Sequence, residues 1–441
     1  MLGQEKALKL LHDAVEYSGA NQTQATLRIG ESSLTRFANS IIHQNVFEKD
    51  VSIAIKAVMG RKVGYASTNR MDEQSIRDLV DKAVMYAKYS QENRDFVSLA
   101  APKPVKHIET CDARTASYSP EDRASAVGDM IEEGARFDAS ASGTFSTGYE
   151  ESAVVSSLGV SAYDAVSLGR ITTVMTAGNG HGYADQMSEK VSDLEPLVVA
   201  AEAASRSERS RDPEWIEPGE YTVILLPYAV AEFMEFLAYL GLGALAYQEG
   251  RSFMSGKLGS RITGENITIW DDGLDMSGLP KAFDPEGVPK QRVDLIVNGV
   301  ANAVVYDSYT AHKEGKESTG HATGGTGTFG PMPTNLLMKP GDCSIEELIT
   351  NTDKGVLVTR FHYVNVIHPT QTIVTGMTRD GTFLIEGGRI TKPVKNLRFT
   401  DSILERFSNV EAISRETMRK DIGVFPAIKA HGFRFTGTTE F

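Results

Sequence analysis

The chain changes character in the stretch Pro213-Glu-Trp-Ile-Glu-Pro-Gly-Glu-Tyr-Thr-Val-Ile-Leu-Leu226. Pro213 and Pro218-Gly219 interrupt regular structure and mark a domain boundary. The apolar run Tyr221–Leu226 then predicts a buried strand. Apolar side chains continue at helical spacing from about Tyr228 to Leu242, so a helix is expected directly after the strand. A buried strand followed by an apolar helix indicates the start of a new hydrophobic core.

Length supports a division of the chain at this point. The protein has 441 residues, whereas single cores rarely grow beyond about 250–300 residues. We therefore predict an N-terminal domain at 1–215 and a C-terminal domain at 219–441. The segment 91–117 contains prolines and mixed polar residues, so a sub-boundary is expected there inside the first domain.

Downstream of the boundary, short apolar segments separated by glycine turns predict a strand-rich domain, either barrel-like or a mixed sheet. The segment Val356–Ile367 is apolar on both alternating faces, which is typical of a central strand covered on both sides. Further strands are expected at 291–297 and 381–390. Two short helices fit Ser344–Asp353 and Asp401–Phe407.

Upstream of the boundary, helices alternate with groups of strands. Ser119-Pro-Glu-Asp is a strong helix start, because serine caps the helix, proline fits its first turn and acidic residues favour the positive end of the dipole. Asn69 or Asp72 can cap another helix that reaches about Tyr89. The pattern predicts an α+β class, with helices packed on an antiparallel sheet. The other expected elements are helices at Gln4–Ser18 and Val191–Arg206, and strands at Ala25–Ile29, Ile41–Phe47, Val51–Met59, Val63–Ala66 and within Phe137–Thr176.

Composition excludes several classes of function. The net charge is −13, and no dense cluster of lysine and arginine offers the basic face that nucleic-acid binding needs. No apolar run reaches the ~18 residues of a membrane-spanning helix, and the N-terminus lacks the features of a signal peptide. Cys111 and Cys343 are far apart and have no CxxC spacing, so no disulfide framework is expected. These features predict a cytoplasmic protein that binds neither membranes nor nucleic acid.

Six blocks in the C-terminal half carry a resemblance to a known family. In order along the chain they are Ser252-Phe-Met-Ser-Gly-Lys-Leu-Gly, Lys316-Glu-Ser-Thr-Gly-His, Pro331-Met-Pro-Thr-Asn, Gly355-Val-Leu-Val-Thr-Arg, Phe383-Leu-Ile-Glu-Gly-Gly-Arg-Ile and Pro393-Val-Lys-Asn-Leu. Together they resemble the TldD/PmbA family, also called modulators of DNA gyrase. The N-terminal half resembles that family more loosely, in its length and in its early strands.

The resemblance implies a cytosolic metallopeptidase built from two related subunits. The TldD-type subunit holds a catalytic metal, zinc or a similar divalent ion, through an HExxxH helix and a later cysteine. The TldE or PmbA type lacks these ligands and completes the enclosed chamber in which unfolded peptides are cut. Because the ligands are missing here, this chain resembles the second type, with no cofactor of its own and with a TldD-like homologue, or a second copy, as its partner.

Alignment of the first block with the family places the metal-binding helix at 235–240. Glu235 then stands at the first histidine position, Phe236 at the general-base glutamate and Leu240 at the second histidine, while the later cysteine falls near Phe425. A zinc peptidase needs three protein ligands, an open position for water and a general base. Phenylalanine and leucine supply neither ligands nor a base, so the inherited metal site is expected to be absent.

A relocated metal site is the alternative. The candidate ligands are His312, His321, His362 and His368. His362 and His368 share a face of a predicted strand, but six residues of extended chain separate them by about 20 Å, so a single ion requires a bend. His312 and His321 flank a glycine-rich loop and can meet only through folding. Histidines that form hydrogen bonds in loops are the simpler interpretation.

The glycine-rich loop Gly320–Gly330 lacks the GKS/T ending of a phosphate-binding loop, so a nucleotide site is not expected. The family resemblance suggests that it lines the chamber and presents backbone groups to an extended peptide; a purely structural turn is the alternative. Glu232 and Glu235 lie one helical turn apart and form a second candidate, because paired carboxylates can act as acid and base. The predicted substrate-binding residues are His321, Thr323, Gly324, Gly325, Pro331, Met332, Pro333 and Asn335.

Three functions therefore compete. The first is a metal-less, TldE/PmbA-like subunit that helps to enclose a chamber and bind unfolded peptides for proteolysis. The second is a stand-alone hydrolase with a relocated metal site. The third is a non-enzymatic, peptide-binding regulatory protein, as the gyrase-modulator name suggests.

Overall fold

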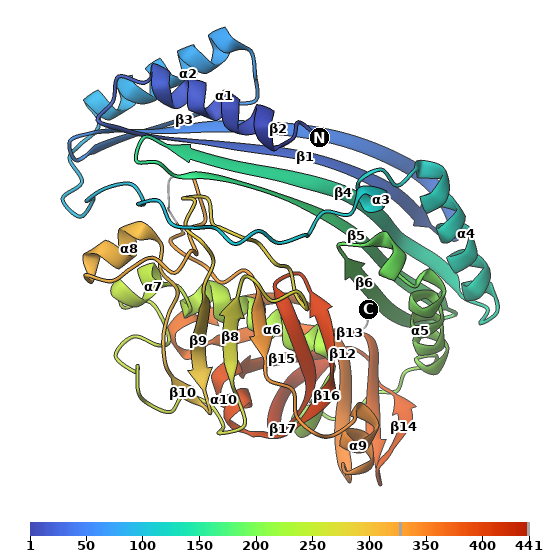
Figure 1. Ribbon diagram of the computed structural model, residues 1–441. Coiled ribbons are helices and arrows are strands. Elements are labelled where there is room, and N and C mark those ends of the chain that lie inside the picture. Colours follow the sequence, from blue (N-terminus) through green and yellow to red (C-terminus); the bar gives the residue numbers. More distant parts are fainter. Residues whose placement is uncertain (326–328, 439–441) are drawn as a thin grey trace.

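The computed structural model describes residues 1–325 and 329–438 and shows an α+β protein, as predicted. A long curved sheet formed by the N-terminal part arches over a strand-rich C-terminal part (Figure 1). No helix within the described residues is long and apolar enough to cross a membrane.

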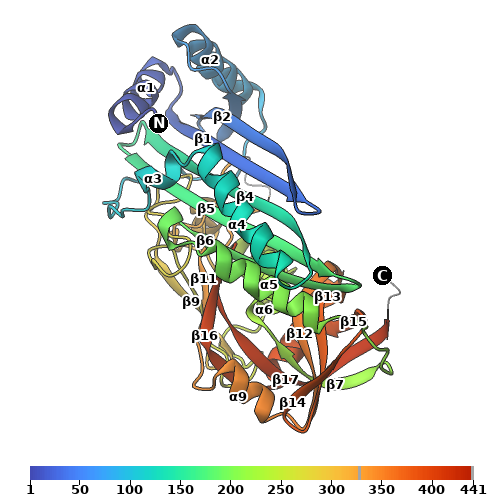
Figure 2. The same cartoon turned by 90° about the vertical axis from the view of Figure 1, so that its right-hand side faces the viewer.

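The N-terminal sheet is antiparallel and has six strands in the order β3-β2-β1-β4-β5-β6. Helices α1 and α2 cover one end of it, and α4 and α5 cover the other (Figures 1 and 2). The central pair joins β1 to β4, so the sheet is completed by chain segments more than a hundred residues apart. The elements are α1 Gln4–Tyr17, β1 Gln22–Ala38, β2 Ile41–Met59, β3 Lys62–Thr68, α2 Glu73–Tyr89, α3 Ala113–Ala116, α4 Pro120–Ala135, β4 Ser140–Ser156, β5 Ser161–Ala177, β6 Gly180–Ser188 and α5 Pro196–Arg209.

The helix caps in this domain follow the local sequence. The Asp72 side chain accepts a hydrogen bond from the Ser75 backbone N–H at the start of α2, and Ser119 accepts one from Asp122 at the start of α4. Each cap satisfies a backbone donor that the first helical turn leaves free. The two helix starts are therefore confirmed, with Asp72 rather than Asn69 as the cap of α2.

Two N-terminal predictions were wrong in extent. The segments Ile41–Phe47 and Val51–Met59 form one continuous strand, because polar residues on its exposed outer half continue the pairing with β1. The helix expected from Val191 begins at Pro196, after a short 3₁₀ turn at Val191–Asp193. Proline is tolerated in the first turn of a helix but not in its interior, so it sets the start here.

The C-terminal sheet combines a closed ring with an open extension. Strand β7 pairs in parallel with β12 and antiparallel with β17, and the succession β7-β12-β13-β15-β17 returns to β7. From β17 the sheet continues outward through β11, β8, β9 and β10. The strands are β7 Gly219–Leu225, β8 Ile269–Asp272, β9 Arg292–Val297, β10 Val300–Ala301, β11 Leu336–Met338, β12 Lys354–His368, β13 Ile373–Glu386, β14 Arg389–Pro393, β15 Leu397–Ser402, β16 Val410–Lys420 and β17 Gly423–Thr438; the helices are α6 Pro227–Gly241, α7 Ala244–Gln248, α8 Ser308–Lys313, α9 Ile345–Thr350 and α10 Ile403–Ser408.

Strand β12 is only partly the doubly covered strand that its sequence predicts. Residues 355–359 are buried on both faces, but beyond Phe361 only one face of the strand packs against the core, through Val364 and Val366. Tyr363 and Ile367 are 76% and 59% exposed. The apolar pattern of Val356–Ile367 therefore combines a buried half with an exposed hairpin.

An aromatic cluster anchors α6 to the ring of strands. Phe233 of α6 stacks on Phe361 of β12 with ring centroids 4.8 Å apart and lies within 6.2–6.4 Å of Phe399 and Phe433. All four side chains are at most 2% exposed. Burial of large aromatic rings contributes strongly to core stability, so this cluster fixes the position of the helix.

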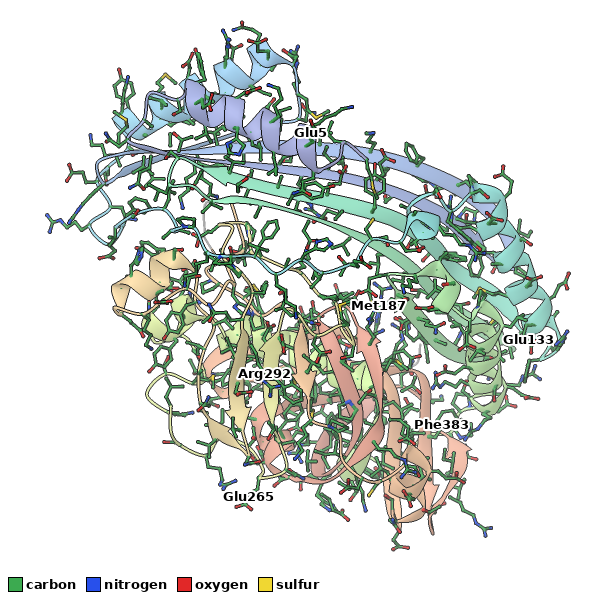
Figure 3. All side chains as sticks on the ribbon, in the orientation of Figure 1. Glu5, Glu133, Met187, Glu265, Arg292 and Phe383 are labelled. Atoms are coloured by element: carbon green, nitrogen blue, oxygen red, sulfur yellow. The ribbon has the colours of Figure 1, made fainter. Side chains whose placement is uncertain are left out.

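The two domains meet at a network of charges. Buried Lys420, at the end of β16, binds Asp185 of β6, and Arg419 binds Glu189 at 2.5 Å. Arg170 of β5 binds Asp421 in the adjoining turn, also at 2.5 Å. Met187 of β6 lies at the same junction (Figure 3). The β16–β17 turn is thus held against the underside of the N-terminal sheet.

Truncation of Phe233 is expected to destabilise the C-terminal domain. Phe233→Ala removes a fully buried ring and leaves a cavity, which costs about 3–5 kcal/mol. Ile367→Ala, at an exposed position of the same domain, is expected to change stability by no more than ~0.5 kcal/mol. Equilibrium urea unfolding followed by fluorescence measures both, and equal effects of the two variants would contradict the assigned core.

Loss of Asp185 is expected to weaken the junction between the domains. Asp185→Ala leaves Lys420 buried without its partner, at a cost of about 3–5 kcal/mol at pH 7. The double variant Asp185→Ala/Lys420→Met is expected to recover most of that loss. Alanine and methionine carry no charge, so burying them has no desolvation cost that an ion pair must offset. Asp13→Ala serves as the control: that carboxylate is 62% exposed and lies on a helix surface, so its loss is expected to change stability little. Urea unfolding curves that show no recovery in the double variant would argue against the ion pair.

Candidate functional site

A cavity of about 460 Å³ lies beside α6 where the N-terminal sheet meets the C-terminal domain. We call it the α6 pocket. Both domains contribute to its walls, and its volume is within the range of small-molecule sites. Its lining residues are Arg170, Tyr183, Tyr228, Ala231, Glu232, Glu235, Phe236, Ala238, Tyr239, Met332, Pro333, Arg360, Phe361, Lys420, Asp421 and Ile422.

Helix α6 presents two carboxylates to this pocket. Glu232 is partly buried and Glu235 is more exposed, one turn further along the helix. Burial raises the pKa of Glu232 to about 7; the positive charge of Arg360 opposes this shift and the negative charge of Glu235 adds to it. Burial, with a smaller effect of Asp421, also raises the pKa of Glu235. Around neutral pH, Glu232 can therefore both release and accept a proton.

The opposite wall carries three cations, each next to an aspartate. Arg170 binds Asp421 at 2.5 Å, and the Nε of Arg360 donates to Asp380 at 2.7 Å. Lys420 binds Asp185, and burial holds the pKa of Lys420 below its usual value despite that partner.

Aromatic rings complete this wall. The guanidinium of Arg360 lies 4.2 Å from the centre of the Tyr183 ring, and the Lys420 ammonium lies 4.8 Å from that of Tyr228. Such contacts favour a cation over the face of a ring. The cations are thus held by aspartates and aromatic rings that do not depend on Glu232 or Glu235.

The structure separates the four positions at which the family's metal site was expected. Glu235 and Phe236 line the α6 pocket. Leu240 is 6% exposed and borders a neighbouring cavity, and Phe425 is fully buried in the C-terminal core. The part of the C-terminal hairpin that reaches the pocket is the preceding segment, Lys420–Ile422.

These residues do not fit a zinc centre. Catalytic zinc is held by histidine, cysteine or carboxylate ligands, usually three of them. At the expected positions only Glu235 is such a donor. Within residues 1–325 and 329–438, no group of three or more histidine, cysteine, aspartate or glutamate side chains is arranged to hold a metal.

The histidines considered for a relocated site are not brought together by this fold. His362 and His368 stay on one strand, opposite Met377 and Ile373 of β13. His312 belongs to α8, whereas His321 is fully buried and its Nε2 lies 2.7 Å from Asp271. Since three donors do not converge in the described part of the chain, the relocated site gains no support.

Two of the predicted substrate-binding residues have structural roles. His321 joins Asp271 and Thr319, and burial is the main reason that its pKa lies below the usual value. Asn335 is also fully buried; its side chain binds the backbone of Asp272, Asp275 and Leu279. These side chains hold the surrounding loops in place, and contact of His321 or Asn335 with a peptide stays a prediction.

The other predicted contacts divide between two cavities. Met332 and Pro333 line the α6 pocket. Thr323, Gly324 and Gly325 line a separate cavity of about 440 Å³ between the domains. The backbone of Pro331 packs against Gly243, where any Cβ would lie 2.0 Å from the Pro331 carbonyl oxygen. Part of the glycine-rich loop, 326–328, lies outside the described residues, and peptide contact by Thr323–Gly325, Pro331, Met332 and Pro333 stays a prediction.

Sequence reasoning missed the polar wall of the α6 pocket. Arg170, Lys420 and Asp421 belong to no recognisable motif, and their partners are distant in sequence. Arg360 ends the block Gly355–Arg360, which was the one available signal. The pair Glu232 and Glu235 was recognised, but its burial was not.

Comparison with known proteins identifies the family. Three models match in order along the chain: PmbA/TldA metallopeptidase domain 1 at residues 27–87, the central domain at 109–211 and the C-terminal domain at 218–437. These matches leave only short segments of the chain uncovered.

Individual relatives agree with this result. The metalloprotease TldD homolog of Haemophilus influenzae is 23% identical over 439 residues, which cover 94% of this chain and 89% of that protein. The metalloprotease PmbA homolog of the same organism is 25% identical over 416 residues, 90% of this chain and 88% of that protein. Archaeal relatives of 30% and 32% identity match over only 43% and 44% of their own length.

The fold also matches that of a solved structure. The crystal structure of TldE from Thermococcus kodakarensis superposes with a TM-score of 0.89, at 19% identity, and covers 97% of this chain and 99% of that one. At this identity the likeness concerns the fold alone. The matches to all three domain models, together with near full-length relatives of both the TldD and the PmbA type, show that the chain belongs to the PmbA/TldD metallopeptidase family.

Proposed function

We propose that this chain is a TldE/PmbA-like subunit that has no catalytic metal of its own and works with a metal-bearing TldD-like relative. In this role it helps to enclose a peptidase chamber and binds unfolded peptides for cleavage by the partner. A heterodimer is the simplest assembly; a homodimer is the alternative.

The donor set at α6 carries the proposal. The helix faces its pocket with Glu232, Glu235 and Phe236, where a metallopeptidase needs several metal ligands and a base that activates water. Glu235 supplies one carboxylate, and Phe236 cannot polarise water. A pocket that presents these side chains suits binding better than metal-dependent hydrolysis.

The walls of the pocket support a role in peptide binding. Phe236, Tyr239 and Met332 supply apolar surface, and charged groups from both domains lie beside it. Binding sites typically combine a mainly apolar lining with a few fixed polar groups. The α6 pocket therefore offers apolar contacts to the side chains of a peptide and polar contacts to its charged ends.

Complex formation with an HExxxH-bearing relative from the same organism tests the proposal. We expect the two chains to co-purify after co-expression, and the complex to cleave short unstructured peptides in a reaction that a metal chelator abolishes. The purified chain alone is expected to bind no stoichiometric zinc and to cleave nothing. Size-exclusion chromatography, metal analysis and a fluorogenic peptide assay measure these properties, with the partner alone as control.

Three results would contradict this function. One zinc ion per chain together with peptide hydrolysis by the chain alone would establish an independent hydrolase. A partner that shows full activity alone and forms no complex would remove the subunit role. Peptide binding without turnover in the presence of the partner would instead favour a regulatory protein.

A further inference from the structure

The α6 pocket contains an imbalance of charge that the proposed function does not explain. The three cations of its wall, Arg170, Arg360 and Lys420, lie against the carboxylates of Asp421, Asp380 and Asp185. Asp380 also lies 3.8 Å from Arg379, outside the pocket. Each cation of this wall therefore already has a carboxylate partner within the protein.

Glu232 and Glu235 have no such compensation. In the described structure neither carboxylate accepts a hydrogen bond or forms an ion pair, although both line the cavity. Arg360 is the nearest cation that affects Glu232, and its guanidinium is bound to Asp380. A partly buried carboxylate without a partner is costly, so the pocket favours a ligand that brings a positive charge.

A second cavity continues the pocket and restricts what the ligand can be. A space of about 450 Å³ shares Tyr239 and Met332 with the α6 pocket, so the two cavities adjoin. Apolar side chains, Leu240 and Phe329 among them, line much of this second space. A ligand that fills both cavities has a cationic end and an extended, partly apolar body. A bare metal ion does not have that shape.

We propose that the α6 pocket binds a protonated primary amine of a peptide, with Glu232 and Glu235 as the ammonium acceptors and with the peptide chain continuing over Tyr239 and Met332 into the adjoining cavity. The amine can be the N-terminus or a lysine side chain, since both present an ammonium group with three N–H donors. The inference rests on the proposed function only in requiring that a peptide enters this pocket.

The surrounding groups define how such binding depends on pH. The titratable and charged groups that face or flank Glu232 come from both domains. They are Arg360 of β12, Arg170 of β5, Tyr183 and Asp185 of β6, Tyr228, Glu235 and Tyr239 of α6, and Lys420 and Asp421 of the C-terminal hairpin. Of these, Arg360 and Glu235 affect the pKa of Glu232, which is about 7. Affinity for an N-terminal amine is therefore expected to rise from pH 6 to about 7.5 as Glu232 ionises. It is expected to fall above ~8 as the α-amine loses its proton.

Three matched tripeptide amides test the inference with the full-length chain. Leu-Gly-Gly amide has a free N-terminus, acetyl-Leu-Gly-Gly amide has no amine, and acetyl-Leu-Gly-Lys amide has only a side-chain amine. Isothermal titration calorimetry at pH 7.5 is expected to show binding at least about tenfold tighter for one or both amine-bearing peptides, because a charge-assisted hydrogen bond is worth ~1.5–3 kcal/mol. The peptide that binds tighter identifies the source of the amine.

Variants connect the effect to the two carboxylates. Glu232→Gln keeps the shape of the side chain and is expected to remove most of the advantage of the amine and its rise between pH 6 and 7.5. Glu235→Gln, at a more exposed position, is expected to reduce the preference for the amine by a smaller factor. Glu265→Gln serves as the control, because that carboxylate is 81% exposed, does not line the pocket and lies at the end of the C-terminal domain away from the N-terminal sheet (Figure 3). Unfolding midpoints in urea check that each variant is folded.

The inference is overturned if the acetylated peptide without lysine binds as tightly as both amine-bearing peptides, or if none of the three binds. It is also overturned if folded Glu232→Gln and Glu235→Gln keep the full preference for the amine. These outcomes do not decide the proposed function, which depends on complex formation and on chelator-sensitive cleavage with the partner.

Discussion

A buried lysine beside a buried aspartate sets the relation between the two halves of this molecule. Removing the charges of Lys420 and Asp185 from water is costly. Their ion pair offsets this desolvation cost only when the two domains are docked. Arg170 with Asp421, and Arg419 with Glu189, surround this pair and restrict the β16–β17 turn further. The turn forms one wall of the α6 pocket, so the shape of the pocket depends on the junction between the domains.

The distance along the chain between contacting residues explains which parts of the fold were predictable. Caps such as Asp72 and Ser119 act within four residues of the helix that they start, and the apolar spacing of α6 is visible in a short window of sequence. The pairing of β1 with β4 and of β7 with β17 joins segments that are far apart, and no local pattern identifies such partners. Lys420 and Asp185 are 235 residues apart, so their contact was equally invisible.

The candidate site was predictable to a similar degree. Alignment placed Glu235 and Phe236 on α6, and both line the pocket; a regular helix fixes the direction of each side chain once its register is known. Phe425, the position aligned with the later cysteine, does not line the pocket, because its side chain is buried in the C-terminal core. His321 and Asn335 belong to recognisable blocks yet lie buried in hydrogen-bond networks. A network of that kind demands particular side chains as strictly as a binding site does.

The position of β17 in the sheet has a consequence for how the protein is made. This strand joins β7 to the ring, although β7 is synthesised roughly 200 residues earlier, about 10–40 s at ~5–20 residues per second. During that interval α6 and the apolar face of β7 have left the ribosome while a strand that encloses them does not yet exist. The nascent chain then exposes an apolar helix and an unpaired strand edge, which are the features that chaperones bind and that promote aggregation. The core around α6 can therefore close only after β17 has been translated.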